Sequence, residues 1–164
     1  MRTVRLRLHV PNQSASDVYA TLADFERYPA LCEAVQNVAV TKRSGNLTVS
    51  RWEVTFRAGL LRWTEEDTFD PGALSITFRQ LDGDAAVFDG SWQCLDAAPG
   101  SEIMFSARLD MGIPSLADAL EPIAARTLID NIVSIVRGLV GRAELVASDI
   151  SVPAPAPAPV GGAS

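Results

Sequence analysis

Residues 47–69 read LTVSRWEVTFRAGLLRWTEEDTF, and this stretch decides the fold class. Apolar Trp52, Val54 and Phe56 alternate with polar residues, which is typical of a strand that buries one face. A second strand is predicted over 60–69, beyond a short Ala-Gly link. Two strands joined this closely are expected to pair as an antiparallel hairpin.

Further strands surround this hairpin. Strict alternation over 2–10 predicts a half-buried strand whose outer face carries His9. Turn residues bound four more predicted strands, over 35–43, 73–81, 86–96 and 102–111. Consecutive strands with short turns between them indicate an antiparallel meander.

Helical segments flank the strands. Ser14 or Ser16 can cap a helix over 15–23, and a short helical piece interrupted by Pro29 follows. After the last strand, apolar residues at helical spacing predict a long helix from 122 to about 147. This helix is the element able to cover the inner face of a curved sheet. We therefore expect an α+β fold with an internal apolar cavity between sheet and helix.

The chain has 164 residues, which suits one domain, predicted over 1–150. Residues 151–164 read SVPAPAPAPVGGAS, and alternating proline cannot form a hydrogen-bonded ladder. We expect a disordered Pro/Ala tail there. The alternative is that this tail binds a partner protein.

Charge and composition exclude several classes of function. The net charge of -6 argues against a nucleic-acid partner and against an anionic membrane surface. One histidine and two cysteines, Cys32 and Cys94, lack metal-ligand spacing, so we expect no metal, no cofactor and inert thiols. No apolar run suggests a signal peptide or a membrane span, which predicts a cytoplasmic protein without integral membrane contact.

The order of elements and several motifs resemble the helix-grip proteins of the START/polyketide-cyclase/pollen-allergen (SRPBCC) superfamily. Residues 24–29 match its Asp-x-x-x-Tyr-Pro motif, residues 90–92 match its Gly-x-Trp hairpin, and the helix from Asn131 to Arg137 is also similar. The resemblance covers about 1–147. It implies a curved antiparallel sheet wrapped around a long C-terminal helix. It also implies a hydrophobic pocket for a polyketide, aromatic or prenylated-quinone ligand, with an acyl-carrier protein as a candidate partner.

The strand over 60–69 places acidic residues on its apolar face. Trp63 and Phe69 share their parity with Glu65 and Asp67, so both carboxyl groups are predicted to point inward. Burial raises the pKa of a carboxyl group toward neutrality, which suits general acid–base work on a poly-β-ketone. The alternative is a β-bulge that flips the parity and leaves one or both carboxyl groups in water.

The resemblance does not carry over completely on this strand. The related aromatase/cyclases have a pocket-facing arginine near its end, where this chain has Asp67 or Thr68. Arg62 has the opposite parity, and Arg126 supplies a positive charge to the pocket only if its helical face turns inward. Either the carboxyl groups do the acid–base work, or the protein binds its ligand without catalysis.

Inward parity predicts the residues that contact the substrate. They are Trp52, Trp63, Phe88, Trp92, Phe105 and Met111 from the strands, and Asn131 from the long helix. Tyr28, near the predicted pocket mouth, is a third catalytic candidate, since its hydroxyl could reach a ligand carbonyl. The alternatives are plain core packing for the aromatic residues and a solvent-facing position for Asn131.

Two functions follow from these observations. The first is a polyketide cyclase/aromatase-like enzyme that holds a poly-β-ketone and uses Asp67 or Glu65 to move protons during ring closure and dehydration. The second is a non-catalytic protein that binds or transports a hydrophobic lipid, quinone or aromatic ligand.

Overall fold

The computed structural model describes residues 1–113 and 117–152, and its main element is one eight-stranded sheet. In chain order the strands are β1 (Arg2–Pro11), β2 (Val35–Ser44), β3 (Leu47–Phe56), β4 (Gly59–Asp70), β5 (Ser75–Gly83), β6 (Val87–Asp96), β7 (Gly100–Asp110) and β8 (Glu144–Ser151). Their order across the sheet is β2-β3-β4-β5-β6-β7-β1-β8. The ladders between them are antiparallel, so the predicted meander runs from β2 to β7.

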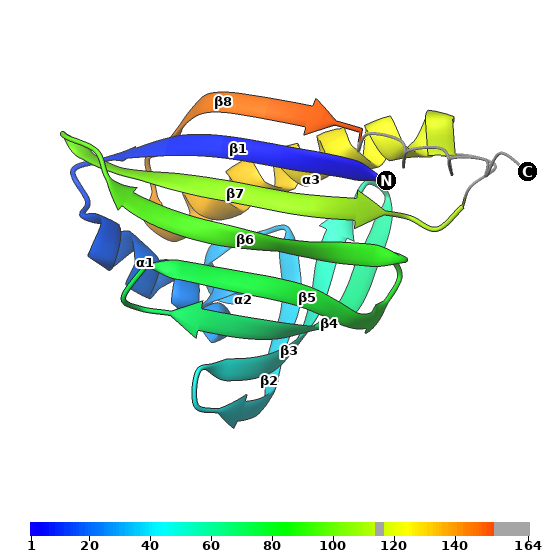
Figure 1. Ribbon diagram of the computed structural model, residues 1–164, viewed down its shortest axis with the longest axis horizontal. Coiled ribbons are helices and arrows are strands. Elements are labelled where there is room, and N and C mark those ends of the chain that lie inside the picture. Colours follow the sequence, from blue (N-terminus) through cyan, green and yellow to red (C-terminus); the bar gives the residue numbers. More distant parts are fainter. Residues whose placement is uncertain (114–116, 153–164) are drawn as a thin grey trace, which may run out of the picture.

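Helix α3 (Ala117–Val140) lies against the sheet, and Figure 1 shows the strands curving around it. Helices α1 (Ala15–Ala23) and α2 (Tyr28–Leu31) lie together at one end of the sheet, joined by a 3-10 turn over Phe25–Arg27. α2 packs against the C-terminal part of α3, where Gly138 lets the backbone approach the carbonyl oxygen of Leu31. This arrangement confirms the α+β helix-grip fold.

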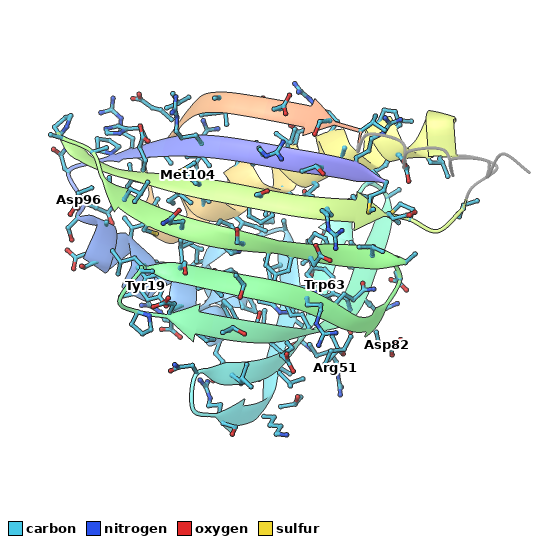
Figure 2. All side chains as sticks on the ribbon, in the orientation of Figure 1. Tyr19, Arg51, Trp63, Asp82, Asp96 and Met104 are labelled. Carbon is cyan, nitrogen blue, oxygen red and sulfur yellow. The ribbon has the colours of Figure 1, made fainter. Side chains whose placement is uncertain are left out.

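The inner and outer faces of the sheet differ as the alternation predicted. In β1, Val4 and Leu6 are buried, while His9 is half-buried on the other face. Figure 2 labels Arg51 of β3 and Met104 of β7, two exposed side chains that alternate along their strands with buried ones. The core therefore lies between the inner face of the sheet and the helices.

The long helix is shorter at its C-terminus than predicted, and a strand follows it. The predicted end near residue 147 is wrong, because α3 ends at Val140 and Gly141 adopts a positive φ of 84°. The amide of Gly141 then donates to the carbonyl oxygen of Arg137, which is a common way to end a helix. The chain reverses, and β8 pairs antiparallel with β1 at the edge of the sheet.

The start of α3 also differs from the prediction. The helix begins at Ala117, so Pro122 lies inside it rather than in its first turn. A proline this close to a helix N-terminus removes one internal hydrogen bond, and the helix tolerates it. The tail predicted over 151–164 begins too early, because Ser151 is the last residue of β8. Residues 153–164 of that predicted tail lie outside the described residues.

The parity of β4 is preserved along its whole pairing with β3. This ladder runs without a register shift from Leu47 opposite Thr68 to Phe56 opposite Gly59. A bulge between Thr64 and Glu65 occurs only in the ladder with β5, and it does not flip the strand. The alternative interpretation, in which a bulge turns the acidic residues into water, is therefore wrong.

Candidate functional site

A cavity of about 70 Å³ lies between the inner face of the sheet and α3. Apolar and aromatic side chains make up most of its lining. The predicted contact residues that line it are Trp52, Trp63, Phe88, Trp92, Phe105 and Asn131. Met111 is not among them, because it follows the end of β7 and packs half-buried against the hydrophobic core.

Two tryptophans form the centre of the aromatic lining. Trp52 and Trp63 face each other across the β3–β4 ladder, with rings 4° from parallel and centroids 6.0 Å apart. Phe25 and Tyr28 point their edges at Trp52, with centroids at 5.1 and 5.3 Å. Phe88 contacts Trp63 in the same way at 5.3 Å. Edge-to-face pairs of this kind stabilise the cluster and give a ligand flat apolar walls.

The polar groups of the cavity lie beside this tryptophan pair. Each row is a pair of residues that face each other across the β3–β4 ladder. On the inward face, the row next to Trp52 and Trp63 is Ser50 opposite Glu65, and the following row is Thr48 opposite Asp67. Successive rows on one face of a strand are about 7 Å apart. The two carboxyl groups therefore lie one and two rows beyond the stacked indoles.

Both predicted carboxyl groups point inward and are buried. The exposed fraction is 5% for Glu65 and 0% for Asp67. Nε1 of Trp63 donates to Oε1 of Glu65 at 2.6 Å, and the hydroxyl of Ser50 donates to Oδ2 of Asp67 at 2.6 Å. Nε1 of Trp52 donates in turn to Oγ of Ser50 at 2.8 Å. Each carboxyl group thus has one fixed hydrogen-bond donor.

The environment of the pair raises the pKa of both carboxyl groups. For Glu65 burial is the main cause, and the hydrogen bond and negative charge of Asp67 add to it, against a smaller opposing effect of Trp63. Burial also raises the pKa of Asp67, opposed by hydrogen bonds from Glu65 and Ser50. Two buried carboxyl groups that interact this closely favour sharing one proton over ionising together.

Tyr28 lines the cavity, and its hydroxyl is bonded to the backbone. Its Oη donates to the carbonyl oxygen of Leu22 at 2.6 Å, and burial raises the pKa of the phenol well above its usual range. The proton that was expected to reach a ligand carbonyl is already committed to the backbone. The structure gives Tyr28 a packing role beside Trp52 and ties α2 to α1.

Asn131 marks the opposite end of the cavity from the carboxyl groups. It borders both the cavity and a surface hollow lined by Thr55, Arg57, Ala58 and Thr127. Its Nδ2 donates to the carbonyl oxygen of Thr55 at 2.8 Å, which joins α3 to the end of β3. Asn131 thus lines both the interior cavity and the surface hollow.

The described residues that line the cavity include no arginine or lysine. Arg62 lies on the outer face of β4, 3.5 Å from a carboxylate oxygen of Glu53, and Arg126 is exposed on α3. Neither arginine replaces the pocket-facing one of the related aromatase/cyclases.

Sequence reasoning missed Ser50 and Phe25. Ser50 is fully buried and links Trp52 to Asp67, and Phe25 packs between Trp52 and Phe69. The parity of β3 could have identified Ser50, because it lies two residues from Trp52 on the same face. The two cysteines are buried and free, and burial raises the pKa of Cys32 to about 11 and of Cys94 to about 12. Their thiols are therefore unreactive, as expected.

Comparison with known families now identifies the chain. A family model described as polyketide cyclase / dehydrase and lipid transport matches residues 12–134. The chain belongs to this family. The match includes β2 to β7 and most of α3, and so contains every residue of the cavity lining except Ile135.

Known members show how far the likeness extends. A bifunctional cyclase/dehydratase of the actinorhodin polyketide synthase from Streptomyces coelicolor is 30% identical over 131 residues. That match covers 75% of this chain but 40% of the relative, so the chain spans well under half of that protein.

Solved structures support the same fold. The Zhui aromatase/cyclase from Streptomyces sp. R1128 superposes with a TM-score of 0.74 at 16% identity, covering 85% of this chain and 92% of that one. A START superfamily protein from Mycobacterium smegmatis gives a TM-score of 0.72 at 15% identity, covering 85% and 97%. Both likenesses concern the fold alone.

Among the described residues, none of the helices has the length and apolar character needed to cross a membrane. The same part of the chain contains no group of three histidine, cysteine or acidic residues arranged to hold a metal ion.

Proposed function

We propose that this protein binds a poly-β-ketone in its aromatic cavity and promotes ring closure and dehydration by proton transfer through Glu65 and Asp67. The observation that carries the proposal is the buried carboxyl pair, whose pKa values are raised and which lies beside the stacked tryptophans. Membership of the polyketide cyclase / dehydrase family supports it.

The chemistry requires a base and an acid close together. The ionised carboxyl group takes a proton from a methylene between two carbonyl groups, and the resulting enolate carbon attacks a second carbonyl carbon of the same chain. The protonated carboxyl group gives its proton to the alkoxide that forms. Removal of another α-proton then expels the hydroxyl group, which leaves as water once it is protonated. No proton is gained or lost by the pair over these steps.

The aromatic walls of the cavity restrict the conformations of the bound polyketone. A flexible polyketone held between flat rings loses the conformations that lead to other rings, so proximity selects one closure. The cavity of about 70 Å³ is smaller than the roughly 300–1,000 Å³ typical of ligand pockets. Binding therefore requires the lining to open, and the contact between Asn131 and Thr55 lies where the opening would form.

Reconstitution tests this function directly. A minimal polyketide synthase with its acyl-carrier protein would be incubated with the protein, and the products separated by chromatography and mass spectrometry. We expect the wild-type chain to redirect the products toward one ring system and the Glu65→Gln, Asp67→Asn double variant to lose that effect. Glu53→Gln, a carboxyl group on the outer face of β3, is the matched control and keeps it. An unchanged product profile with and without the wild-type protein would contradict the proposal.

A second candidate function is non-catalytic binding of a lipid or quinone. The observation in its favour is the almost entirely apolar lining, which contains no arginine or lysine among its described residues. Mass spectrometry of ligands that purify with the protein discriminates the two functions. A prenylquinone or lipid in the cavity, together with wild-type product profiles from the double variant, would favour the binder.

A further inference from the structure

The hydrogen bonds around the carboxyl pair have a fixed direction. An indole N–H only donates, so Oγ of Ser50 must accept from Nε1 of Trp52 at 2.8 Å. The hydroxyl hydrogen of Ser50 is then free to point at Oδ2 of Asp67, 2.6 Å away. Within the described part of the chain Ser50 makes no other side-chain hydrogen bond, so Asp67 is the acceptor available to it.

A proton on Oδ2 of Asp67 would conflict with this arrangement. Oγ of Ser50 would then accept from both Trp52 and Asp67, and its own hydrogen would have no acceptor among the described residues. Ser50 and Asp67 are both completely buried, so water does not replace the missing partner. The chain from Trp52 through Ser50 therefore keeps a proton off Oδ2 of Asp67, and the hydrogen bond from Ser50 lowers the pKa of this carboxyl group.

The second carboxyl group has one oxygen free for a proton. Oε1 of Glu65 accepts from Nε1 of Trp63 at 2.6 Å, which leaves Oε2 as the oxygen that can carry hydrogen. Oδ1 of Asp67 is buried and has no hydrogen-bond partner among the described residues while both groups are ionised. The side chains of Glu65 and Asp67 interact by a hydrogen bond that raises the pKa of Glu65 and lowers that of Asp67. A hydroxyl on Glu65 would supply the donor that Oδ1 of Asp67 lacks.

We propose that Ser50, oriented by Trp52, is a positioning residue that keeps Asp67 ionised and leaves the shared proton on Oε2 of Glu65. Glu65 is then the general acid of the cavity and Asp67 its general base. This assignment rests on the proposed function for its catalytic meaning, but the location of the proton is a property of the free protein.

The neighbouring ionisable groups do not change this assignment. Among the described residues, Tyr28 of α2 is the ionisable group of another element that interacts with the pair, and burial keeps its phenol neutral. Glu66 lies on the outer face of β4, 3.6 Å from Arg79, and its negative charge raises the pKa of Asp67. Ser50 acts against that effect, since its hydrogen bond lowers the pKa of Asp67.

Carboxyl-carbon NMR of the substrate-free protein tests the assignment. In wild type at neutral pH we expect the side-chain carbon of Glu65 at its protonated position and that of Asp67 at its ionised position. In Ser50→Ala the titration of Asp67 moves up by about one pH unit, because one hydrogen bond to a charged group is lost. Glu65 becomes correspondingly more ionised at neutral pH. Ser101→Ala removes another completely buried serine, one that is remote from the cavity lining, and leaves both titrations unchanged.

A second variant keeps the test decisive if Ser50→Ala does not fold. Trp52→Phe keeps an aromatic ring at this position but removes the indole N–H that orients Ser50. The titration of Asp67 then moves up, as it does in Ser50→Ala. A proton on Asp67 with Glu65 ionised in wild type would overturn the assignment. Unchanged titrations of Glu65 and Asp67 in Ser50→Ala would also overturn it, provided that dispersed indole NMR signals show the variant to be folded.

Activity separates this assignment from the proposed function. If the protein is a cyclase, Ser50→Ala lowers kcat with little change in KM and shifts the pH profile of kcat. Ser50→Thr keeps a hydroxyl at this position, so its kcat is expected to lie between those of wild type and Ser50→Ala. If product profiles never respond to the protein while the NMR titrations shift as expected, the proposed function fails and the proton assignment stands.

Discussion

The two faces of β4 carry the same kind of residue in opposite environments. Glu65 faces the cavity, is 5% exposed and accepts from an indole, whereas Glu66, the next residue, lies on the outer face 3.6 Å from Arg79. Burial raises the pKa of Glu65 well above its usual range. The comparison shows that strand parity, rather than residue type, gives this protein its candidate chemistry.

The largest effect is expected from removing packing on the inner face. Phe105→Ala deletes a ring that is 2% exposed and contacts Phe78 and Trp92. We expect a loss of about 3–5 kcal/mol in the free energy of unfolding, measured by urea denaturation. Met104→Ala, the neighbouring residue with 41% exposure on the outer face, should change it by less than about 0.5 kcal/mol. Equal losses in the two variants would contradict the division into faces.

The next effect is a dependence of stability on pH. A carboxyl group with a higher pKa in the folded than in the unfolded chain binds more protons when folded, so stability falls as pH rises between the two pKa values. Glu65 is such a group. Glu65→Gln should therefore gain stability relative to wild type as pH rises above the ordinary carboxyl range, by about 1.4 kcal/mol for each unit of pKa shift.

Thermal unfolding over a range of pH measures this difference. Glu53→Gln, on the outer face of β3, is the control and should follow the wild-type curve. If Glu65→Gln also followed the wild-type curve, Glu65 would not be held protonated by the fold.

A smaller effect is expected at the other end of the cavity. Asn131→Ala removes the hydrogen bond to the carbonyl oxygen of Thr55, which should cost about 1 kcal/mol of stability. We also expect faster uptake of an apolar fluorescent probe, measured by stopped-flow mixing. Asp130→Ala, an exposed neighbour on α3, should change neither quantity. Unchanged uptake in Asn131→Ala would place the opening elsewhere.

The sequence predicted the inner face of the sheet well. Alternation is a strong signal when one face is buried, so the inward positions of Glu65, Asp67 and the three tryptophans followed from parity alone. The pairing of β4 with β3 has no register shift that would have upset this parity.

The misses occurred where burial gives no signal. β8 is exposed on both faces, so ELVASDIS shows no one-sided pattern. Its first residues, up to about 147, were predicted as the end of the preceding helix, and Ser151 as the start of the tail. Met111 continues the parity of β7 but lies beyond the end of the strand. The hydroxyl of Tyr28 bonds to the backbone of the preceding helix, and that of Ser50 bonds to a residue of the neighbouring strand. A one-dimensional alternation pattern contains neither partner.

The central claim is that Glu65 and Asp67 together hold one proton at neutral pH inside the cavity. Infrared spectroscopy measures this most directly, because a protonated carboxylic acid absorbs separately from a carboxylate. We expect one protonated-carboxyl band at neutral pH in wild type and in Glu53→Gln, and its loss in Glu65→Gln. Absence of that band in the folded wild-type protein would show that the two carboxyl groups do not share a proton.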